Sequence, residues 1–430
     1  MKNLKKKGFT IVELVIVIAV IAILSAVLIP TFSSLIKKAN MSADHQAVKE
    51  LNNGLVIGSI EGDPQSIDDV ANMLNEAGYN SFESLAPISK GYNFYWLKST
   101  NQIVLVEVET GEVAFSVKGD EVDFAKELAA GNAFNLKRAA GEVEVTNEDD
   151  AVEALEKGQS IKLTSDLNID NTIIVNKGED VVIDLGIYTI TAPTQKARPF
   201  TLREGSKLTI NASENANEIT CGEYGLVRIE GSNTELVLNG GNYKANTSNG
   251  AFIRPINGAK NVKIVLNNVC YEDTSSDGFI MNINGAGDNI SIEVNGGEFS
   301  ANAGFQVRNG VFKNVKITTN CVAYEINGNA TLDTCTINVG SSQVSTAPSA
   351  CIAVSGNGTA NVTGCTLDGD GNTDAAYYVY SSGGSITASN NNVDLSKFKN
   401  EFLPNDLSGL NEGKSALIVI DGVEKLNISK

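Results

Sequence analysis

Histidine, tryptophan and proline are scarce in this sequence, with one, one and eight of them in 430 residues. The six cysteines form no CxxC pair and have no histidine near them, which argues against a thiolate metal site. The lone histidine, His45, has no second ligand nearby in the sequence, so we expect it at a solvated helix position. Glycine, by contrast, occurs 40 times, between short apolar runs. This composition is typical of many short strands joined by turns.

Positive charge is also in short supply, and it is unevenly placed. The formal net charge is −18, although residues 1–38 hold six lysines against a single acid, Glu13. The rest of the chain is therefore strongly acidic. Because an acidic surface repels phosphate backbones, we expect no nucleic acid among its partners.

A nearly unbroken apolar run extends from Phe9 to Ile29. As a helix it just spans a hydrocarbon core of about 30 Å, and the preceding lysines would keep its amino end in the cytoplasm. Gly8 lies between the lysines and the run, where a secretory signal would have its cut site after the apolar residues instead. Glu13 puts a carboxylate into hydrocarbon, which costs roughly 2.5–3.5 kcal/mol without a partner. Such an acid is usually functional.

The segment KKKGFTIVELVIVIAVIAILSAVLIPTF resembles the amino-terminal motif of type IV pilins and the related pseudopilins. The resemblance implies that a prepilin peptidase cuts between Gly8 and Phe9 and methylates the new amino group of Phe9. It also implies that Glu13 pairs with the terminal amine of a neighbouring subunit, since two buried opposite charges are tolerable together and costly apart. The alternative is a plain signal anchor with a chance glutamate.

Pro30 removes one helical hydrogen bond, and we expect a kink there, after which the helix resumes. Beyond it, apolar residues recur at three- and four-residue steps and predict one stripe that packs on a globular unit. The stripe consists of Leu35, Ile36, Ala39, Ala43, Ala47, Leu51 and Leu55.

A small α+β unit is predicted next, and it resembles in outline the units that follow the first helix in many pilins. Residues 66–79 have a helix pattern with Ser66 or Asp63 as the cap. Residues 92–98 and 102–108 alternate or run apolar around a turn, as in a hairpin. The aromatic residues of the first strand fit a core better than a binding patch.

The second half of the chain repeats itself every 28 residues. Apolar and asparagine positions keep this spacing through four units, as in Leu208, Leu236, Ile264 and Ile292, and in Asn211, Asn239, Asn267 and Asn295. Such units are typical of a right-handed parallel β-helix with an asparagine ladder at a left-handed corner, over roughly ten turns. A β-sandwich or a propeller is the alternative. AVEALEKGQSIKLTSDLNI resembles the opening of pectate-lyase-like β-helices, in which a helix covers the open end.

These patterns together predict a multidomain chain. Its segments are a leader at 1–8, a membrane and assembly helix at 9–32, an amphipathic continuation at 33–61, the α+β unit at 62–137, a linker and capping helix at 138–157, the β-helix at 158–396 and a tail at 397–430.

Two further patterns are candidate sites of chemistry. Asp368, Asp370, Asn372 and Asp374 alternate as in a calcium loop, but the usual glycine and the final glutamate are missing, so a polar turn competes with a calcium site. The arginines Arg203, Arg228, Arg254 and Arg308 lie near one another in the repeat without a matching group of acids. We therefore expect no enzyme and no cofactor other than this candidate calcium.

The expected function is that of a pilin-like subunit, minor or at the tip, in a surface filament. It would sit in the membrane by a single pass before assembly, with an extracellular β-helix that binds glycans or another surface. Two alternatives stay open: a polysaccharide lyase or hydrolase on a pilin anchor, and a pseudopilin of a secretion or DNA-uptake system.

Overall fold

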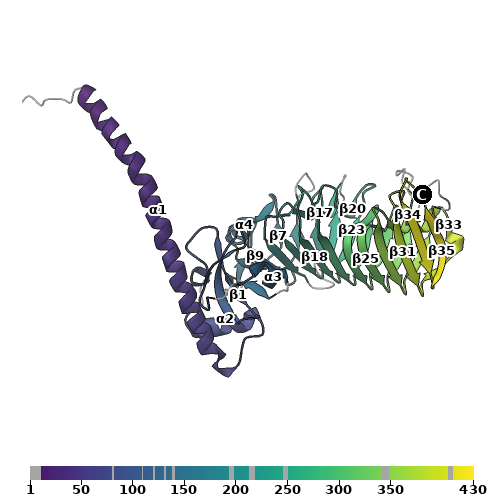
Figure 1. Ribbon diagram of the computed structural model, residues 1–430, viewed down its shortest axis with the longest axis horizontal. Coiled ribbons are helices and arrows are strands. Elements are labelled where there is room, and N and C mark those ends of the chain that lie inside the picture. Colours follow the sequence, from purple (N-terminus) through teal and green to yellow (C-terminus); the bar gives the residue numbers. More distant parts are fainter. Residues whose placement is uncertain are drawn as a thin grey trace, which may run out of the picture. The chain divides into compact units, whose positions relative to one another are not determined.

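The computed structural model describes most of the chain. The described residues are 11–79, 82–108, 110–119, 122–129, 132–137, 141–192, 198–212, 218–245, 250–340, 348–404 and 410–430. Among these, the side chains of residues 11–17, 19–31, 33, 61, 82, 83, 125, 128 and 129 are outside the description. The chain divides into two compact units, Met1–Ala139 and Ala140–Lys430 (Figure 1).

The first unit combines helices with a small antiparallel sheet. Its elements are α1 (Ile11–Gly58), the 3-10 helix η1 (Ser59–Glu61), α2 (Ile67–Glu76), the 3-10 helix η2 (Phe82–Leu85), β1 (Tyr92–Leu97), β2 (Gln102–Glu107), β3 (Val113–Ser116), α3 (Phe124–Ala129) and β4 (Ala133–Asn135). The sheet order is β3-β2-β1-β4, and β1 and β2 form the predicted hairpin. Helix α1 is continuous through Pro30, so the helix resumes as expected.

The amphipathic part of α1 packs through fewer residues than its sequence predicts. Leu51 and Leu55 are buried, but Leu35 and Ile36 keep 55% and 59% of their surface exposed. The packed face starts only at Asp44, because the rest of the unit contacts α1 from there on. His45, expected at a solvated helix position, is half-buried there, and its ring stacks on Phe115 at 4.3 Å between centroids.

Helix α2 begins with a complete capping box. Ser66 accepts a hydrogen bond from Asp69 N, and the Asp69 carboxylate accepts one from Ser66 N. This arrangement satisfies two main-chain donors that the first turn would leave free. In the sheet, Phe94, Tyr95 and Trp96 of β1 are buried, so the aromatic residues of this strand serve the core.

The second unit is a β-solenoid of about 8 turns, from residue 167 to 403, rather than the ten turns expected. Its strands are β5 (Glu142–Val145), β6 (Ser160–Leu163), β7 (Leu167–Asn168), β8 (Ile173–Val175), β9 (Asp180–Asp184), β10 (Ile190–Thr191), β11 (Phe200–Leu202), β12 (Lys207–Asn211), β13 (Glu218–Thr220), β14 (Val227–Ile229), β15 (Glu235–Asn239), β16 (Asn242–Ala245), β17 (Ala251–Pro255), β18 (Val262–Asn267), β19 (Cys270–Asp273), β20 (Phe279–Met281), β21 (Ile290–Asn295), β22 (Glu298–Ala301), β23 (Ala303–Lys313), β24 (Lys316–Thr319), β25 (Tyr324–Asp333), β26 (Thr336–Val339), β27 (Ala350–Val354), β28 (Gly358–Thr363), β29 (Thr366–Gly369), β30 (Thr373–Val379), β31 (Gly384–Ser389), β32 (Asn392–Val393), β33 (Phe398–Leu403), β34 (Ser415–Ile420) and β35 (Val423–Ser429).

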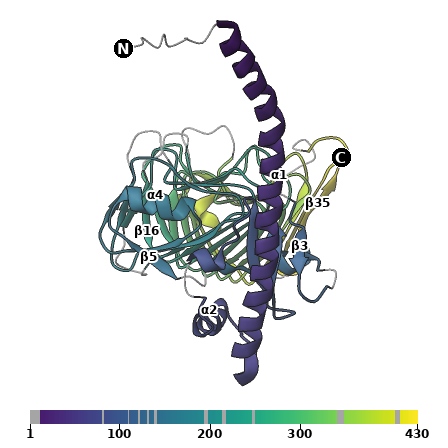
Figure 2. The ribbon, with the colours of Figure 1, turned by 90° about the vertical axis from the view of Figure 1, so that its left-hand side faces the viewer.

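Parallel pairing stacks these strands into three rows. Row A contains the strands β8, β11, β14, β17, β20, β27, β30 and β33. Between β20 and β27 it also contains the first parts of β23 and β25. Row B contains the strands β5, β6, β9, β12, β15, β18, β21, β28, β31 and β34. Between β21 and β28 it also contains the second parts of β23 and β25. Row C is the ten-stranded sheet from β7 to β32. Seen nearly along the solenoid axis, successive turns overlie one another (Figure 2).

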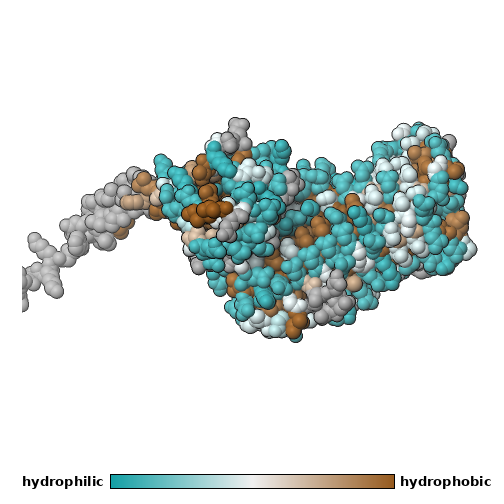
Figure 3. Space-filling view, turned by 90° about the horizontal axis from the view of Figure 1, so that it is seen from below, coloured by the Kyte–Doolittle hydropathy of each residue, from teal (hydrophilic) through white to brown (hydrophobic). Residues whose placement is uncertain are grey.

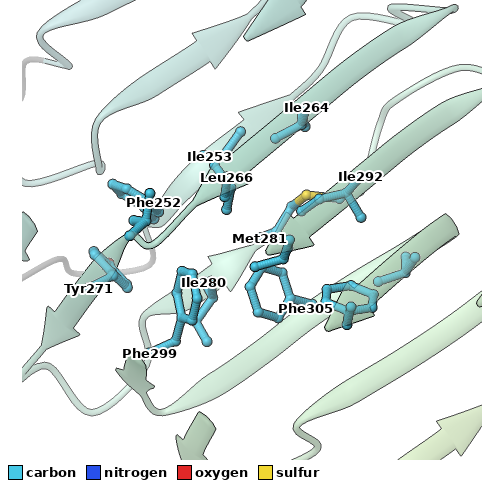
Figure 4. Packing of buried hydrophobic residues seen from close by; sticks show 14 of the residues in the cluster. Phe252, Ile253, Ile264, Leu266, Tyr271, Ile280, Met281, Ile292, Phe299 and Phe305 are labelled. Atoms are coloured by element: carbon cyan, nitrogen blue, oxygen red, sulfur yellow. The ribbon is translucent and has the colours of Figure 1, made fainter. Parts of the chain in front are cut away.

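The 28-residue period appears directly as strand register. Leu208 pairs with Leu236, which pairs with Ile264, which in turn pairs with Ile292. Their side chains are buried in one continuous core with those of rows A and C, where Phe252 stacks on Tyr271 at 4.3 Å (Figure 4). A single apolar position repeated along the chain therefore becomes a column of contacts along the solenoid.

The two ends of the solenoid differ from the predicted boundaries. Strand β5 already belongs to row B, so the segment 138–157 is more than a linker. Helix α4 (Glu148–Glu156) follows it and buries Ala151, Ala154 and Leu155 against the first strands, as a capping helix would. At the other end the predicted tail 397–430 is wrong, because β33 and β34 continue rows A and B and β35 closes β34 as an antiparallel hairpin. The alternating pattern of Ala416, Ile418 and Leu426 explains this, since their burial extends the core.

Candidate functional site

The amino-terminal residues form the first candidate site. Gly8 and Phe9 lie outside the described residues, and Glu13 and Pro30 lie within α1, with side chains outside the description. Among the residues that can be described, no helix has both the length and the apolar character needed to cross a membrane. The cleavage, methylation, pairing and kink expected at these four positions therefore stay predictions.

The predicted asparagine ladder is present at the end of row B. Each side-chain amide donates to the previous turn: Asn239 Nδ2 to Asn211 Oδ1 at 2.9 Å, Asn267 to Asn239 at 2.8 Å, and Asn295 to Asn267 at 3.0 Å. The ladder asparagines do not occupy the left-handed corner, however. The next residue does, as at Gly240, Asn268 and Gly296, with φ of 70°, 51° and 74°. The ladder thus supports a corner that its neighbours form.

A second asparagine ladder was not predicted from the sequence. Asn261 Nδ2 donates to Asn233 Oδ1 at 3.0 Å, and Asn289 Nδ2 donates to Asn261 Oδ1 at 2.9 Å. All three residues adopt the left-handed conformation, with φ between 53° and 59°. They recur at the same 28-residue spacing, which is the signal that would have revealed them.

The carboxylates of the candidate calcium loop pair with other residues of the solenoid and do not form a cluster. Asp368 forms an ion pair with Lys397 at 2.9 Å, and Asp374 forms one with Lys399 at 2.9 Å. Asp370 accepts a hydrogen bond from Asn372 N at 2.8 Å, as in a polar turn. In the described part of the chain, no group of three or more acidic, His or Cys side chains is arranged to hold a metal ion. The structure does not bring these carboxylates together.

Row A positions that point away from the core lie one above another along the solenoid, and two of them, Thr201 and Ala353, are themselves buried. They alternate with the buried column of Ile253, Met281 and Phe305, so their side chains leave the core on the opposite side of the same strands. We call these positions the row A strip. In order they are Thr201, Arg228, Arg254, Asn282, Gln306, Glu325, Ala353, Tyr378 and Leu403.

A shallow groove of about 340 Å³ crosses the middle of this strip. Polar groups line it together with rings, namely Asp277, Asn302, Gln306, Glu325, Phe279 and Tyr380. Gln306 Nε2 donates to Glu325 Oε2 at 3.2 Å, which links these two side chains of the groove lining. The ring of Tyr380 lies 4.4 Å from that of Tyr378.

Burial and charge keep the phenol of Tyr380 protonated. Its pKa is raised, first by burial and then by the nearby carboxylate of Glu325. Tyr380 therefore contributes a neutral phenol to the lining of the groove. Sequence reasoning missed this site because its residues come from five separate turns of the chain and only the register of row A brings them together.

Figure 3 shows one face of the molecule. The face visible in Figure 3 is largely hydrophilic, with smaller apolar patches between. The buried cysteines Cys335 and Cys365 lie in the core of adjacent turns, where Cys335 N donates to Cys365 Sγ at 3.3 Å, and both are free thiols. They belong to the packing and not to a surface site.

Comparison with known proteins concerns the amino-terminal residues. Residues 3–29 match the family model of the prokaryotic N-terminal methylation motif. No curated protein and no solved structure matches the chain. The motif implies processing by a prepilin peptidase and assembly with other pilin subunits. The chain thus joins the methylation motif of type IV pilin-like and pseudopilin precursors, at residues 3–29, to a β-solenoid.

Proposed function

We propose that the mature chain is a minor or tip subunit of a type IV pilus-like filament and that its solenoid binds a glycan on another surface. The methylation motif supports the assembly half of this proposal. Helix α1 adds to it, because Phe32, Leu35 and Ile36 expose more than half of their surface. Large apolar side chains in such a row gain free energy when neighbouring subunits cover them.

The proposed position of the subunit in the filament follows from the size of its solenoid. A solenoid of about 8 turns is much larger than the small α+β unit that precedes it. Copies packed at close helical spacing would bring these solenoids into conflict, whereas a single copy at a tip has no such neighbours. Immunogold electron microscopy that showed dense labelling along whole filaments would contradict the tip assignment.

The groove is the observation that carries the binding half. Glycans are recognised through aromatic rings beside fixed hydrogen-bonding groups, and the groove is lined by Tyr380 together with Gln306 and Glu325 of the row A strip. A hydrogen bond between Gln306 and Glu325 fixes their positions before a ligand arrives, which lowers the entropy cost of binding. We propose binding without turnover.

A glycan array tests the proposal. The processed chain in detergent is applied in wild-type form and as Gln306→Ala and Tyr380→Ala, and reducing ends are measured in the bound glycan. Thr331→Ala is the matched control, because Thr331 is an exposed residue of β25 that does not line the groove. Binding that both groove variants lose and the control keeps supports the proposal. Equal binding by all four proteins contradicts it, and new reducing ends would favour the enzyme alternative.

A further inference from the structure

Two arginines lie side by side at one end of the row A strip. Arg228 of β14 pairs in register with Arg254 of β17, so their Cα atoms belong to neighbouring parallel strands about 4.8 Å apart. Like charges directly opposite each other on adjacent strands destabilise a sheet. Repulsion between the two guanidinium groups therefore opposes folding, and only Arg228 of the two has an ion pair that offsets it, with Glu230 at 2.8 Å.

Other cations of the solenoid have acidic neighbours. Glu235 of β15 lies between Lys207 and Lys263, at 2.9 Å and 3.1 Å. Lys244 similarly forms an ion pair with Glu218 at 2.8 Å across two turns. Alternating charge is thus the usual arrangement from turn to turn, and the arginine pair departs from it.

A third arginine increases the positive charge at this place. Arg198 retains only 8% of its surface, and its Nη1 donates a long hydrogen bond of 3.4 Å to Val227 O. Its pKa is lowered to about 10, first by burial and then by the charges of Arg254 and Arg228. A buried cation without an anionic partner is costly to the fold.

The arginines in this part of the solenoid outnumber the acidic residues that pair with them. Glu230 forms ion pairs with Arg203 at 3.0 Å and with Arg228 at 2.8 Å. In the described part of the chain no ion pair includes Arg198 or Arg254, and the buried Nε of Arg254 has no hydrogen-bond partner. Donors are therefore left over, on a chain whose net charge is −18.

We infer that Arg198, Arg228 and Arg254 form a binding site for a phosphate group. An arginine donates in a fixed planar fork, and one fork satisfies a carboxylate. Three guanidinium groups match better the larger number of oxygens and the higher charge of a phosphate, and Arg198 contacts the main chain of Val227, next to Arg228. Binding would remove the repulsion between the arginines and supply the missing acceptor for Arg254 Nε.

The site lies on the same strip as the proposed glycan groove. Arg254 is followed along the strip by Asn282 and then by Gln306, which lines the groove. The inference rests on the proposed function only in taking the phosphate of a surface polymer as the ligand. Free phosphate would bind through the same contacts, so the two sources need separate measurements.

Isothermal titration of the processed chain in detergent tests the inference. The probes are inorganic phosphate, a short poly(glycerol phosphate) and trigalacturonate as the carboxylate comparison. We expect both phosphates to bind, and Arg254→Gln to weaken them at least about tenfold, as the loss of a charged hydrogen bond implies. Lys263→Gln is the matched control, because it removes one positive charge from a cation that has an acidic partner. It should change affinity less than about twofold.

A second measurement separates a binding role from a structural one. Without ligand, Arg254→Gln should leave the melting temperature unchanged or raise it, because it removes a like-charged neighbour; added phosphate should stabilise the wild type only. Three results would overturn the inference. The first is a lower melting temperature of Arg254→Gln without ligand, and the second is equal phosphate affinity of Arg254→Gln and the wild type. The third is a loss of phosphate affinity in Lys263→Gln as large as that in Arg254→Gln. Preference for trigalacturonate would overturn the choice of phosphate. Binding of free phosphate but not of the polymer would exclude the surface polymer as the source of the bound phosphate group. None of these results would affect the proposed glycan binding at Tyr380.

Discussion

Asn52 of helix α1 and Ile103 of strand β2 exchange two hydrogen bonds. Asn52 Nδ2 donates to Ile103 O at 2.7 Å, and Ile103 N donates to Asn52 Oδ1 at 2.9 Å. Both residues are buried, and Nδ2 also donates to Val48 O at 2.8 Å. One side-chain amide thereby satisfies both main-chain polar groups of Ile103 and fixes the helix on the sheet.

We expect Asn52→Ala to destabilise the first unit by about 1–3 kcal/mol for each main-chain group that it leaves buried and unpaired. Asn53→Ala is the matched control, since Asn53 is the next residue of the helix and is exposed. Trp96 is the only tryptophan and is buried in this unit, so urea unfolding followed by its fluorescence reports on the unit alone. Equal midpoints for the two variants would contradict the structural role of Asn52.

The Asn52 contact shows where prediction from sequence stops. The apolar spacing of α1 correctly identified Leu51 and Leu55 as buried, because periodicity reports the face of a helix. It could not show that a polar residue on that face meets the free main chain of a strand 51 residues further on. Leu35 and Ile36 continue the same pattern and are exposed, since a pattern does not say where the partner surface ends.

Loss of one ladder residue should weaken the solenoid locally. Asn239→Ala removes the acceptor for Asn267 and the donor for Asn211, and we expect a loss of about 1–3 kcal/mol in the free energy of unfolding. Asn329→Ala, at an exposed position of β25, should have a much smaller effect. Urea unfolding followed by far-ultraviolet circular dichroism compares them. Faster hydrogen exchange confined to the turns next to residue 239 would show that the effect is local, because each turn contacts mainly its neighbours.

The repeat was predictable from sequence for the same reason that the ladder matters. A fixed 28-residue spacing can persist only where equivalent residues stack, so Asn211 and its successors could be paired without a structure. The groove could not be found this way, because Gln306, Glu325 and Tyr380 are unlike one another and do not repeat. A predicted tail at 397–430 failed because its strands depart from the period and only their register shows that they continue the rows.

Acid should weaken the solenoid partly through Glu235. Its pKa is lowered: burial alone would raise it, but the ion pairs with Lys207 and Lys263 outweigh burial. A folded-state pKa below that of the unfolded chain contributes stability above the ordinary glutamate value of about 4.3, and this stability is lost as pH falls through the folded value.

Glu235→Gln should therefore cost about 1–3 kcal/mol at pH 7, because both lysines lose a charged acceptor, and the difference from wild type should shrink toward pH 3. Urea midpoints at pH 7, 5 and 3 measure it. Glu144→Gln makes the same charge change at an exposed position of β5 and should have little effect at any of the three. A difference for Glu235→Gln that stayed constant with pH would show that the carboxylate's charge is not the cause.

The last prediction concerns the amino-terminal motif, on which the assembly proposal depends. We expect mass spectrometry of protein from the native cell to find a chain that begins at N-methylated Phe9, and Gly8→Val to leave the lysine-rich leader attached. Glu13→Gln should be cleaved normally but fail to enter filaments, because the buried terminal amine of a neighbour would lack its counter-ion. Glu13→Asp, which keeps the charge, should restore part of the assembly measured in sheared filament fractions. A native chain that starts beyond Pro30 would remove the helix from the mature subunit and with it the proposed filament.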